Sequence, residues 1–242
     1  AESNLKRIVL ELGGKSPFVV LEDVRDYDFA AGHAVQAAFW NMGENCTGNS
    51  RIILPRKRTD EFIDAMKRHL AGWKIGNPLD PENALGSMVS EGQFKTVMGY
   101  IEKGKAEGAV PVVGGVPLDI GGGLFIPPTI FDNVSPTHTI AREEIFGPVT
   151  AILPVDPDEE ALALANDTVY GLQATLFTDD VSKALRYARA LKAGTVSVNN
   201  FSEGDNTTPF GGYKLSGFGG KDKGRESHDQ YVETKTIFLK LK

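Results

Sequence analysis

Cys46 is the only cysteine in the 242-residue chain, and it is the side chain best suited to nucleophilic chemistry. It stands at a break in a helical pattern, in the stretch 39–48 (FWNMGENCTG), where Gly, Asn and Thr would let a thiol face a cleft. A cysteine attacks a carbonyl carbon as a thiolate or with the help of a nearby base. Taken alone, Cys46 fits an inert buried thiol as well as it fits a nucleophile.

Glu11 is the candidate base. It lies at the end of an apolar run, 8–12, that stops at two glycines. Partial desolvation at such a strand end would raise the pKa of the carboxyl group and make it a better base near neutral pH. A strand and a helix separate Glu11 from Cys46, enough chain for a crossover that returns to the same edge of a sheet. A solvated acid is the simpler interpretation of Glu11 by itself.

Two later segments also combine polar and aromatic residues. In 143–149 (EEIFGPV), Glu144 and Phe146 precede a Gly-Pro pair, and they could hold a ribose hydroxyl and pack against a ring. The same segment fits an ordinary loop with a surface acid and an anchoring Phe. The segment 209–217 (PFGGYKLSG) could wrap a ligand or serve as a mobile linker.

Several classes of protein are not favoured. The net charge is −6 and no long basic run occurs, so nucleic acid is not an expected partner. No apolar run approaches the about 20 residues of a membrane span, and one cysteine fits a reducing compartment such as the cytoplasm. We expect no metal site, because the histidines are scattered without ligand spacing: His33, His69, His138 and His228.

The predicted elements alternate between strands and helices. Strands are expected at 8–12, 18–21, 51–54, 110–113, 148–155, 173–177 and 195–199. Helices are expected at 26–39, at 60–73 after a Thr59 cap, from 91 to near Gly104 or Gly108 after a Ser90 cap, at 158–166 and at 180–192. This order predicts an α/β fold, a mostly parallel twisted sheet with helices on both faces, plus a C-terminal β tail at 234–241.

In such sheets the ligand site lies at the carboxyl ends of the strands. We therefore expect the segments that follow strands to converge on one crevice, namely 11–13, 199–200 and 211–212.

Five stretches, in this order, resemble motifs of the NAD(P)-dependent aldehyde dehydrogenase superfamily. The segment 10–17 (LELGGKSP) resembles its glutamate motif and 39–46 (FWNMGENC) its cysteine motif; the three further blocks are 143–149, 170–172 (YGL) and 209–217. Each block is weak alone, but five in the right order make the resemblance specific over essentially the whole chain.

The resemblance implies a mechanism. Cys46 would attack an aldehyde to give a thiohemiacetal, hydride would pass to NAD or NADP, and Glu11 would activate water to hydrolyse the resulting thioester. The backbone N–H of Cys46 would form part of the oxyanion hole. Retention of Glu11 argues against the branch that passes the thioester to CoA. Implied cofactor-binding residues are Glu144 on the nicotinamide ribose, Phe146 beside the nicotinamide, and the backbone of Leu12 and Gly13.

Within the superfamily, the segment 198–212 and the Lys221-Asp222-Lys223 run are most similar to the γ-glutamyl-γ-aminobutyraldehyde dehydrogenase branch. That branch implies an aldehyde from polyamine breakdown. Asp205 and Glu203 would then be candidates to meet a polar or cationic substrate tail, with Phe210 as a further candidate in the substrate pocket.

The chain departs from the family in length. Family chains place a Rossmann-type cofactor domain before the glutamate motif, where this sequence begins. The resemblance implies the end of a cofactor-domain strand with the glutamate motif at 1–13, a catalytic domain at 14–206, and a tail at 207–242 carrying an oligomerisation strand. We therefore expect this chain to bind neither NAD nor NADP by itself, to be inactive as an isolated dehydrogenase and to form a homo-oligomer through its C-terminal strand.

Two alternatives stand beside this interpretation. The chain could be an esterase that uses Cys46 and Glu11 on activated esters without a cofactor. It could also be a non-catalytic, self-associating module, because a truncated face and an unpaired tail would expose apolar surface.

Overall fold

A computed structural model describes residues 5–242, so the first four residues of the expected segment 1–13 lie outside the described part. Its main feature is a sheet in the order β4-β5-β6-β3-β2-β7-β8, in which only β4 runs antiparallel to its neighbour. The strands are β2 (Pro17–Val20), β3 (Arg51–Pro55), β4 (Val110–Val113), β5 (Thr129–Asp132), β6 (Val149–Val155), β7 (Gln173–Phe177) and β8 (Thr195–Val198). The mostly parallel sheet is confirmed.

Helices cover both faces of this sheet. Side chains along β2 and the residue after it alternate, so that Phe18 and Val20 pack toward one layer and Val19 and Leu21 toward the other. Each such side chain, fully buried, stabilises the fold by about 1.5–3 kcal/mol. The first layer holds α1 (Tyr27–Phe39) and α2 (Thr59–Leu70); the second holds α3 (Glu91–Ala106), α4 (Thr139–Arg142), α5 (Asp158–Asn166) and α6 (Val181–Ala190).

The helix termini match the sequence patterns in part. Asp26 caps α1 through Phe29 N–H, and Ser90 caps α3 through Gln93 N–H. The Thr59 cap is wrong: Arg58 precedes α2, and the Thr59 hydroxyl is buried without a partner. α2 also ends three residues earlier than predicted.

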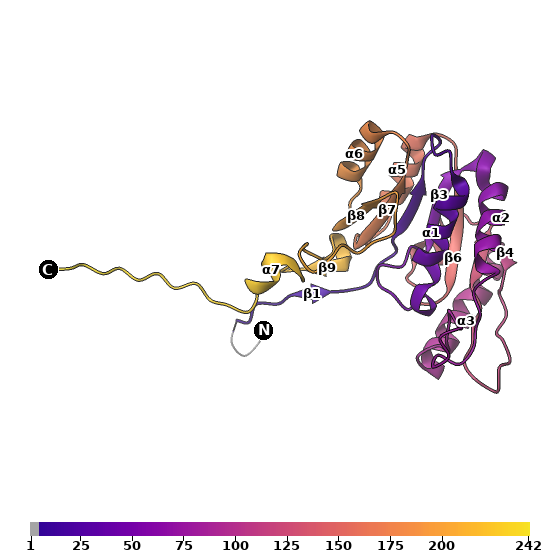
Figure 1. Cartoon of the computed structure of the whole chain (residues 1–242), viewed down its shortest axis with the longest axis horizontal. Coiled ribbons are helices and arrows are strands. Elements are labelled where there is room, and N and C mark those ends of the chain that lie inside the picture. The colour runs from indigo at the N-terminus through magenta and orange to yellow at the C-terminus, as the bar shows by residue number, and fades with distance from the viewer. Residues whose placement is uncertain (1–4) are drawn as a thin grey trace.

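A second, two-stranded sheet joins the beginning and the end of the chain. The predicted strand 8–12 forms only β1 (Leu10–Glu11), which pairs antiparallel with β9 (Gly217–Phe218). Both lie outside the seven-stranded sheet, between its body and the C-terminal tail (Figure 1). The helical turn Lys214–Ser216 precedes β9, and α7 (Gly224–His228) follows it.

The expected β tail at 234–241 is not a strand in this structure. These residues extend away from the body with no assigned secondary structure, and Ile237, Phe238 and Leu239 are 78–96% exposed (Figure 1). A single strand has no hydrogen-bonding partner of its own, so its backbone cannot form a ladder without another edge.

Candidate active site

The Cys46 loop begins with an abrupt turn at the end of α1. Asn41, Met42 and Gly43 have φ values of 54°, 56° and 66° in succession, within the helical turn Trp40–Gly43. The left-handed region is costly for residues other than glycine. At Gly43 there is also no room for a side chain, because a Cβ atom would lie 2.2 Å from the Gly147 carbonyl oxygen. The turn therefore brings the Cys46 loop into close contact with the segment that carries Glu144 and Phe146.

Hydrogen bonds between Asn45 and Thr47 then form a tight turn with Cys46 between them. The Asn45 side-chain oxygen accepts hydrogen bonds from the Thr47 N–H at 3.1 Å and from the Thr47 hydroxyl at 3.0 Å. The thiol at the centre of this turn is partly exposed. Burial raises its pKa, and the negative charges of Glu203 and Glu144 raise it further, while the N–H groups of Cys46 and Thr47 lower it. The resting side chain is therefore a thiol that has to lose a proton before it can attack.

Glu144 connects the loop before β6 to the glutamate motif before β2. Its Oε1 accepts a hydrogen bond of 2.9 Å from the Gly14 N–H. Its Oε2 lies so close to Gly13 that a Cβ atom there would be 2.0 Å away. Burial raises the pKa of the Glu144 carboxyl group, and the Gly14 N–H and the charge of Lys15 oppose this.

Gly14 brings the glutamate motif up to the nucleophile itself, since a Cβ atom at Gly14 would lie 2.3 Å from the Cys46 carbonyl oxygen. A small cavity of about 10 Å³ separates the Cys46 loop from the segment 144–147. Three of the five resembled motifs therefore meet at one place.

The meeting point lies at the amino ends of β2, β3 and β6, because Gly14, Cys46 and Glu144 all precede their strands. The crevice expected at the carboxyl ends concerns the segments 11–13, 199–200 and 211–212, whereas Gly14, Cys46 and Glu144 meet at the amino edge. The reason is topological: β2 and β3 are parallel neighbours, so α1 must carry the chain back to the amino edge before Cys46 is reached.

Phe146 projects from this site in a restrained backbone conformation. Its φ is 55° and its side chain is 39% exposed. The Gln93 side-chain amide donates hydrogen bonds to the carbonyls of Ile145 (3.1 Å) and Phe146 (2.7 Å). The Gln93 side chain therefore holds the Phe146 loop against the start of α3.

Glu11 lies against the segment 209–217. Both of its carboxylate oxygens are buried without a hydrogen-bond partner, and Oε1 faces Gly211. Burial and the charge of Asp222 raise the Glu11 pKa, and Lys221 lowers it. Within residues 5–242 no hydrogen bond joins Glu11 to Cys46, so its role as a base stays a prediction. The neighbouring Leu12 is held by a backbone hydrogen bond from its N–H to the Ser216 carbonyl.

The three candidate substrate residues differ in position. Glu203 reaches the Cys46 loop, where its Oε1 accepts hydrogen bonds from the Asn45 amide (3.3 Å) and from the Thr47 hydroxyl. Asp205 is exposed and bonds the N–H and hydroxyl of Thr207 in its own turn. Phe210 pairs through its backbone with Asp222. Of the three, only Glu203 contacts the Cys46 loop in the described structure.

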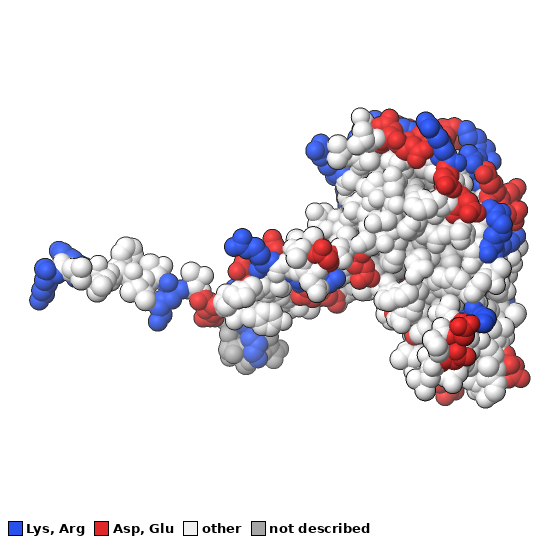
Figure 2. Space-filling view, in the orientation of Figure 1, with Lys and Arg blue, Asp and Glu red and all other residues white. Residues whose placement is uncertain are grey.

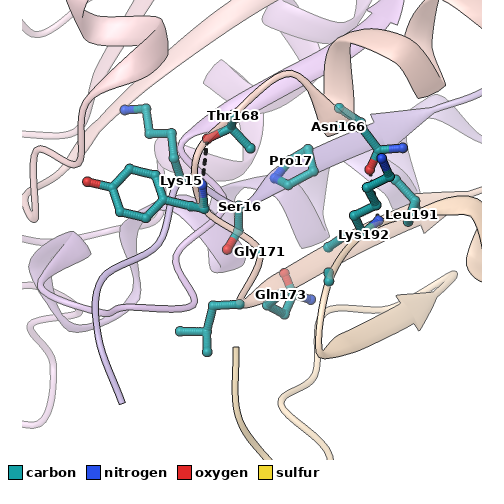
Figure 3. A pocket seen from close by; sticks show the side chains of 14 residues that line it. Lys15, Ser16, Pro17, Asn166, Thr168, Gly171, Gln173, Leu191 and Lys192 are labelled. Atoms are coloured by element: carbon teal, nitrogen blue, oxygen red, sulfur yellow. Dashed lines mark hydrogen bonds between the residues drawn. The ribbon is translucent and has the colours of Figure 1, made fainter. Parts of the chain in front are cut away.

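Lys15 was not singled out by the sequence. Its side chain is 1% exposed and its Nζ has no hydrogen-bond partner. Burial and the charge of Arg51 lower its pKa to about 7, against the opposing charges of Glu144 and Glu143. Lys15, Asn166 and Lys192 line one small cavity, and the Lys15 side chain points away from the other two residues (Figure 3). Its place inside the glutamate motif was the only available signal.

On the face shown in Figure 2, Lys and Arg lie among Asp and Glu along the rim of the body and beside the C-terminal segment, and the middle of the body carries little charge. In the part of the chain that the structure describes, no three His, Cys, Asp or Glu side chains form a potential metal site. No helix among residues 5–242 combines the length and apolar character that crossing a bilayer requires.

Comparison with known proteins decides the family. The sequence profile of the Aldehyde dehydrogenase family matches residues 1–237. The chain belongs to the aldehyde dehydrogenase family. It is 49% identical over 239 residues to the aminoacetaldehyde dehydrogenase of Pseudomonas aeruginosa, covering 99% of this chain and 48% of that relative. It is 40% identical over 240 residues to the NADP/NAD-dependent aldehyde dehydrogenase PuuC of Escherichia coli, with the same coverage.

Solved structures of family members agree with the fold. The aldehyde dehydrogenase KauB of Pseudomonas aeruginosa matches with a TM-score of 0.95 and 48% identity, over 99% of this chain and 48% of that one. The indole-3-acetaldehyde dehydrogenase AldA of P. syringae, solved with NAD⁺, matches with a TM-score of 0.95 and 47% identity over the same shares. This aldehyde dehydrogenase chain spans about half the length of the relatives that it matches.

Proposed function

We propose that the chain is the catalytic portion of an enzyme that oxidises an aldehyde to a carboxylate, with Cys46 as the nucleophile. The observation that carries this proposal is the convergence of Cys46, Gly14 and Glu144 at one edge of the sheet. The Cys46 sulfur, once deprotonated, adds to the aldehyde carbon to give a thiohemiacetal. Loss of hydride from that carbon gives a thioester, and water releases the acid. Glu11 is the proposed base for that water.

The residues around Cys46 fit the nicotinamide end of NAD or NADP. Gly13 lets the Glu144 carboxylate approach the backbone, because a Cβ atom there would lie 2.0 Å from Oε2, and Glu144 has carboxylate oxygens suited to ribose hydroxyls. Phe146 presents a partly exposed ring that can pack beside the nicotinamide, and the backbone at Leu12 and Gly13 can line the pocket. The cofactor, when bound, supplies the hydride acceptor. We propose that the isolated chain does not hold it and does not turn over.

We further propose an aminoaldehyde with a free ammonium group as the substrate, such as aminoacetaldehyde. In γ-glutamyl-γ-aminobutyraldehyde the corresponding nitrogen is an uncharged amide, so that aldehyde would not place a positive charge beside Cys46. The support is the acid Glu203, placed on the two neighbours of Cys46, and the identity to a relative named aminoacetaldehyde dehydrogenase. An ammonium group near the aldehyde would find its counter-charge there. Asp205 and Phe210 have weaker support, because their contacts lie in their own turn and with the segment that follows β9.

The test is protection of Cys46 in the chain itself. An aldehyde that forms the thiohemiacetal blocks alkylation by iodoacetamide, and aminoacetaldehyde differs from propanal only by an ammonium group in place of a methyl. We expect aminoacetaldehyde to protect Cys46 at about tenfold lower concentration, the usual effect of one well-placed charge. The Glu203→Gln variant should lose this preference. Equal protection by both aldehydes in the unaltered chain would contradict the cationic substrate.

A second measurement addresses turnover. The chain is mixed with NAD⁺ or NADP⁺ and an aldehyde, and the absorbance of the reduced cofactor is followed. We expect no sustained rise. Robust turnover would contradict the proposed inactivity of the isolated chain, while protection of Cys46 without turnover would agree with both parts of the proposal.

We also propose a cytoplasmic location, which the single cysteine supports, and self-association through the residues 234–241. That tail exposes Ile237, Phe238, Leu239 and Leu241, and an unpaired extended segment with this pattern can add to a sheet edge of a second copy. Sedimentation of the whole chain and of a chain ending at Glu233 should show association only in the first. A whole chain that stays monomeric at every concentration would contradict this proposal.

A further inference from the structure

Glu203 occupies an unusual electrostatic position. Its carboxylate lies against both neighbours of Cys46, through the Asn45 amide and the Thr47 hydroxyl. Both donors are neutral, so neither compensates its charge. Among residues 5–242, no Lys, Arg or His forms an ion pair with Glu203.

The second carboxylate oxygen is available to a ligand. Both hydrogen bonds that Glu203 makes in the described structure use Oε1, and Oε2 accepts none. The residue is only partly buried, so Oε2 can meet a group that enters beside Cys46. Hydrogen bonds thus hold Oε1 of the carboxylate in place, while Oε2 is free to bind a ligand.

The charge of Glu203 acts on the thiol as well. The groups that oppose ionisation of Cys46 electrostatically are Glu203 and Glu144, and each raises the Cys46 pKa in addition to burial. Glu144 is held by a different partner, the Gly14 N–H, and forms no hydrogen bond with Glu203 or its two partners in the described structure. A positive charge placed on Glu203 would therefore remove one of the two opposing charges and leave the other in place.

We propose that Glu203 couples recognition of the substrate to activation of the nucleophile: its negative charge adds to burial in holding Cys46 in the thiol form, and the ammonium group of a bound aminoaldehyde offsets that charge and favours loss of the proton. This inference rests on the proposed function for its substrate class. The Sγ–H bond breaks, the proton passes to solvent or buffer, and the electron pair stays on sulfur. The thiolate then forms the bond to the aldehyde carbon. A neutral aldehyde would bind next to a nucleophile that is still protonated.

The first experiment measures the rate of Cys46 alkylation by iodoacetamide against pH, in the unaltered chain and in Glu203→Gln. Iodoacetamide is uncharged, so Glu203 cannot attract or repel it. Glutamine keeps a carbonyl oxygen for the Asn45 and Thr47 hydrogen bonds and removes only the charge. We expect the profile of Glu203→Gln to move to lower pH, with alkylation about tenfold faster near neutral pH.

The matched control is Glu159→Gln, which removes an exposed acid of α5 that has no part in the proposed site. Its profile should coincide with that of the unaltered chain. If Glu203→Gln also coincides with the unaltered chain, the coupling is refuted. If Glu159→Gln moves as far as Glu203→Gln, a general charge effect explains the result and the proposal is again refuted.

The second experiment adds a cation without an aldehyde. Ethylammonium chloride, compared with sodium chloride at equal ionic strength, should accelerate alkylation of the unaltered chain toward the Glu203→Gln rate and leave Glu203→Gln unchanged. No acceleration, or equal acceleration of both, would overturn the proposal. Neither experiment uses an aldehyde or NAD, so a failed coupling is distinguishable from a failed oxidation.

Discussion

Replacement of the buried Lys15 by methionine should change how the stability of the chain depends on pH. Lys15 Nζ has no hydrogen-bond partner, and burial together with the charge of Arg51 lowers its pKa from 10.5 to about 7. In the unfolded chain the amine is solvated and keeps its ordinary pKa. Between about pH 7 and 10.5 the unfolded chain therefore binds one more proton than the folded chain. Stability rises with pH wherever the unfolded state binds more protons.

The size of the change in the free energy of unfolding follows from the width of this pH range. Each pH unit in which the two states differ by one proton is worth about 1.4 kcal/mol. From pH 7 to 9 the folded amine goes from half-protonated to neutral while the unfolded amine stays charged. The Lys15 contribution should therefore increase the free energy of unfolding by about 2 kcal/mol over these two units. Methionine has a similar length and no charge, so Lys15→Met should lack this increase.

The assay is guanidinium unfolding of the unaltered chain and of Lys15→Met at pH 7, 8 and 9. Other groups that titrate in this range contribute equally to both proteins, so the difference between the two isolates Lys15. We expect Lys15→Met to be the more stable protein at pH 7 and the advantage to shrink by about 2 kcal/mol at pH 9. Lys192→Met, at an exposed lysine that lines the same cavity, is the control and should show no such change. A constant difference between the unaltered chain and Lys15→Met at all three pH values would refute the reasoning.

Two further predictions concern the loops that meet at Cys46. Gly13→Ala would place a Cβ atom 2.0 Å from Glu144 Oε2 and force the carboxylate off the Gly14 N–H, so the free energy of unfolding should fall by about 1–3 kcal/mol. The control is Gly99→Ala in α3, where a Cβ atom would have nothing within 4 Å. This change should raise the free energy of unfolding by about 0.5–1 kcal/mol in the same denaturation assay. Gln93→Ala removes both hydrogen bonds to the carbonyls of Ile145 and Phe146, so amide hydrogen exchange over 145–147 should accelerate at least severalfold relative to Lys95→Ala, and equal rates would contradict a positioning role for Gln93.

The alternation of strands and helices was predictable because it depends on local pattern. The apolar residues of 18–21 read as a buried strand, and Ala30, Ala34 and Ala38 recur at helical spacing; in the structure these residues face the core as β2 and α1. Local chemistry likewise set the Ser90 cap. Such features need only neighbours within a few residues, so periodicity and capping rules are sufficient to find them.

The short strand β1 shows where local pattern is not sufficient. The run 8–12 that contains it reads as a strand, but the hydrogen-bond partner of β1 is β9, more than 200 residues away in the sequence. The tail 234–241 has the pattern of a strand and no partner strand among residues 5–242. A strand exists only with its partner, and a sequence pattern does not name the partner.

The same distinction between local pattern and tertiary contacts applies to the candidate site. The sequence by itself determined which residue types could do the chemistry, the thiol of Cys46 and the acids Glu144 and Glu203, and it determined the α/β class through hydrophobic periodicity. Only the tertiary structure decided that the motifs meet at the amino edge of the sheet, that Glu203 and not Asp205 reaches the Cys46 loop, and that Lys15 is sealed from water. Those outcomes depend on the crossover of α1 and on the solvation of charges by residues distant in the chain, and both are properties of the folded arrangement that local sequence does not specify.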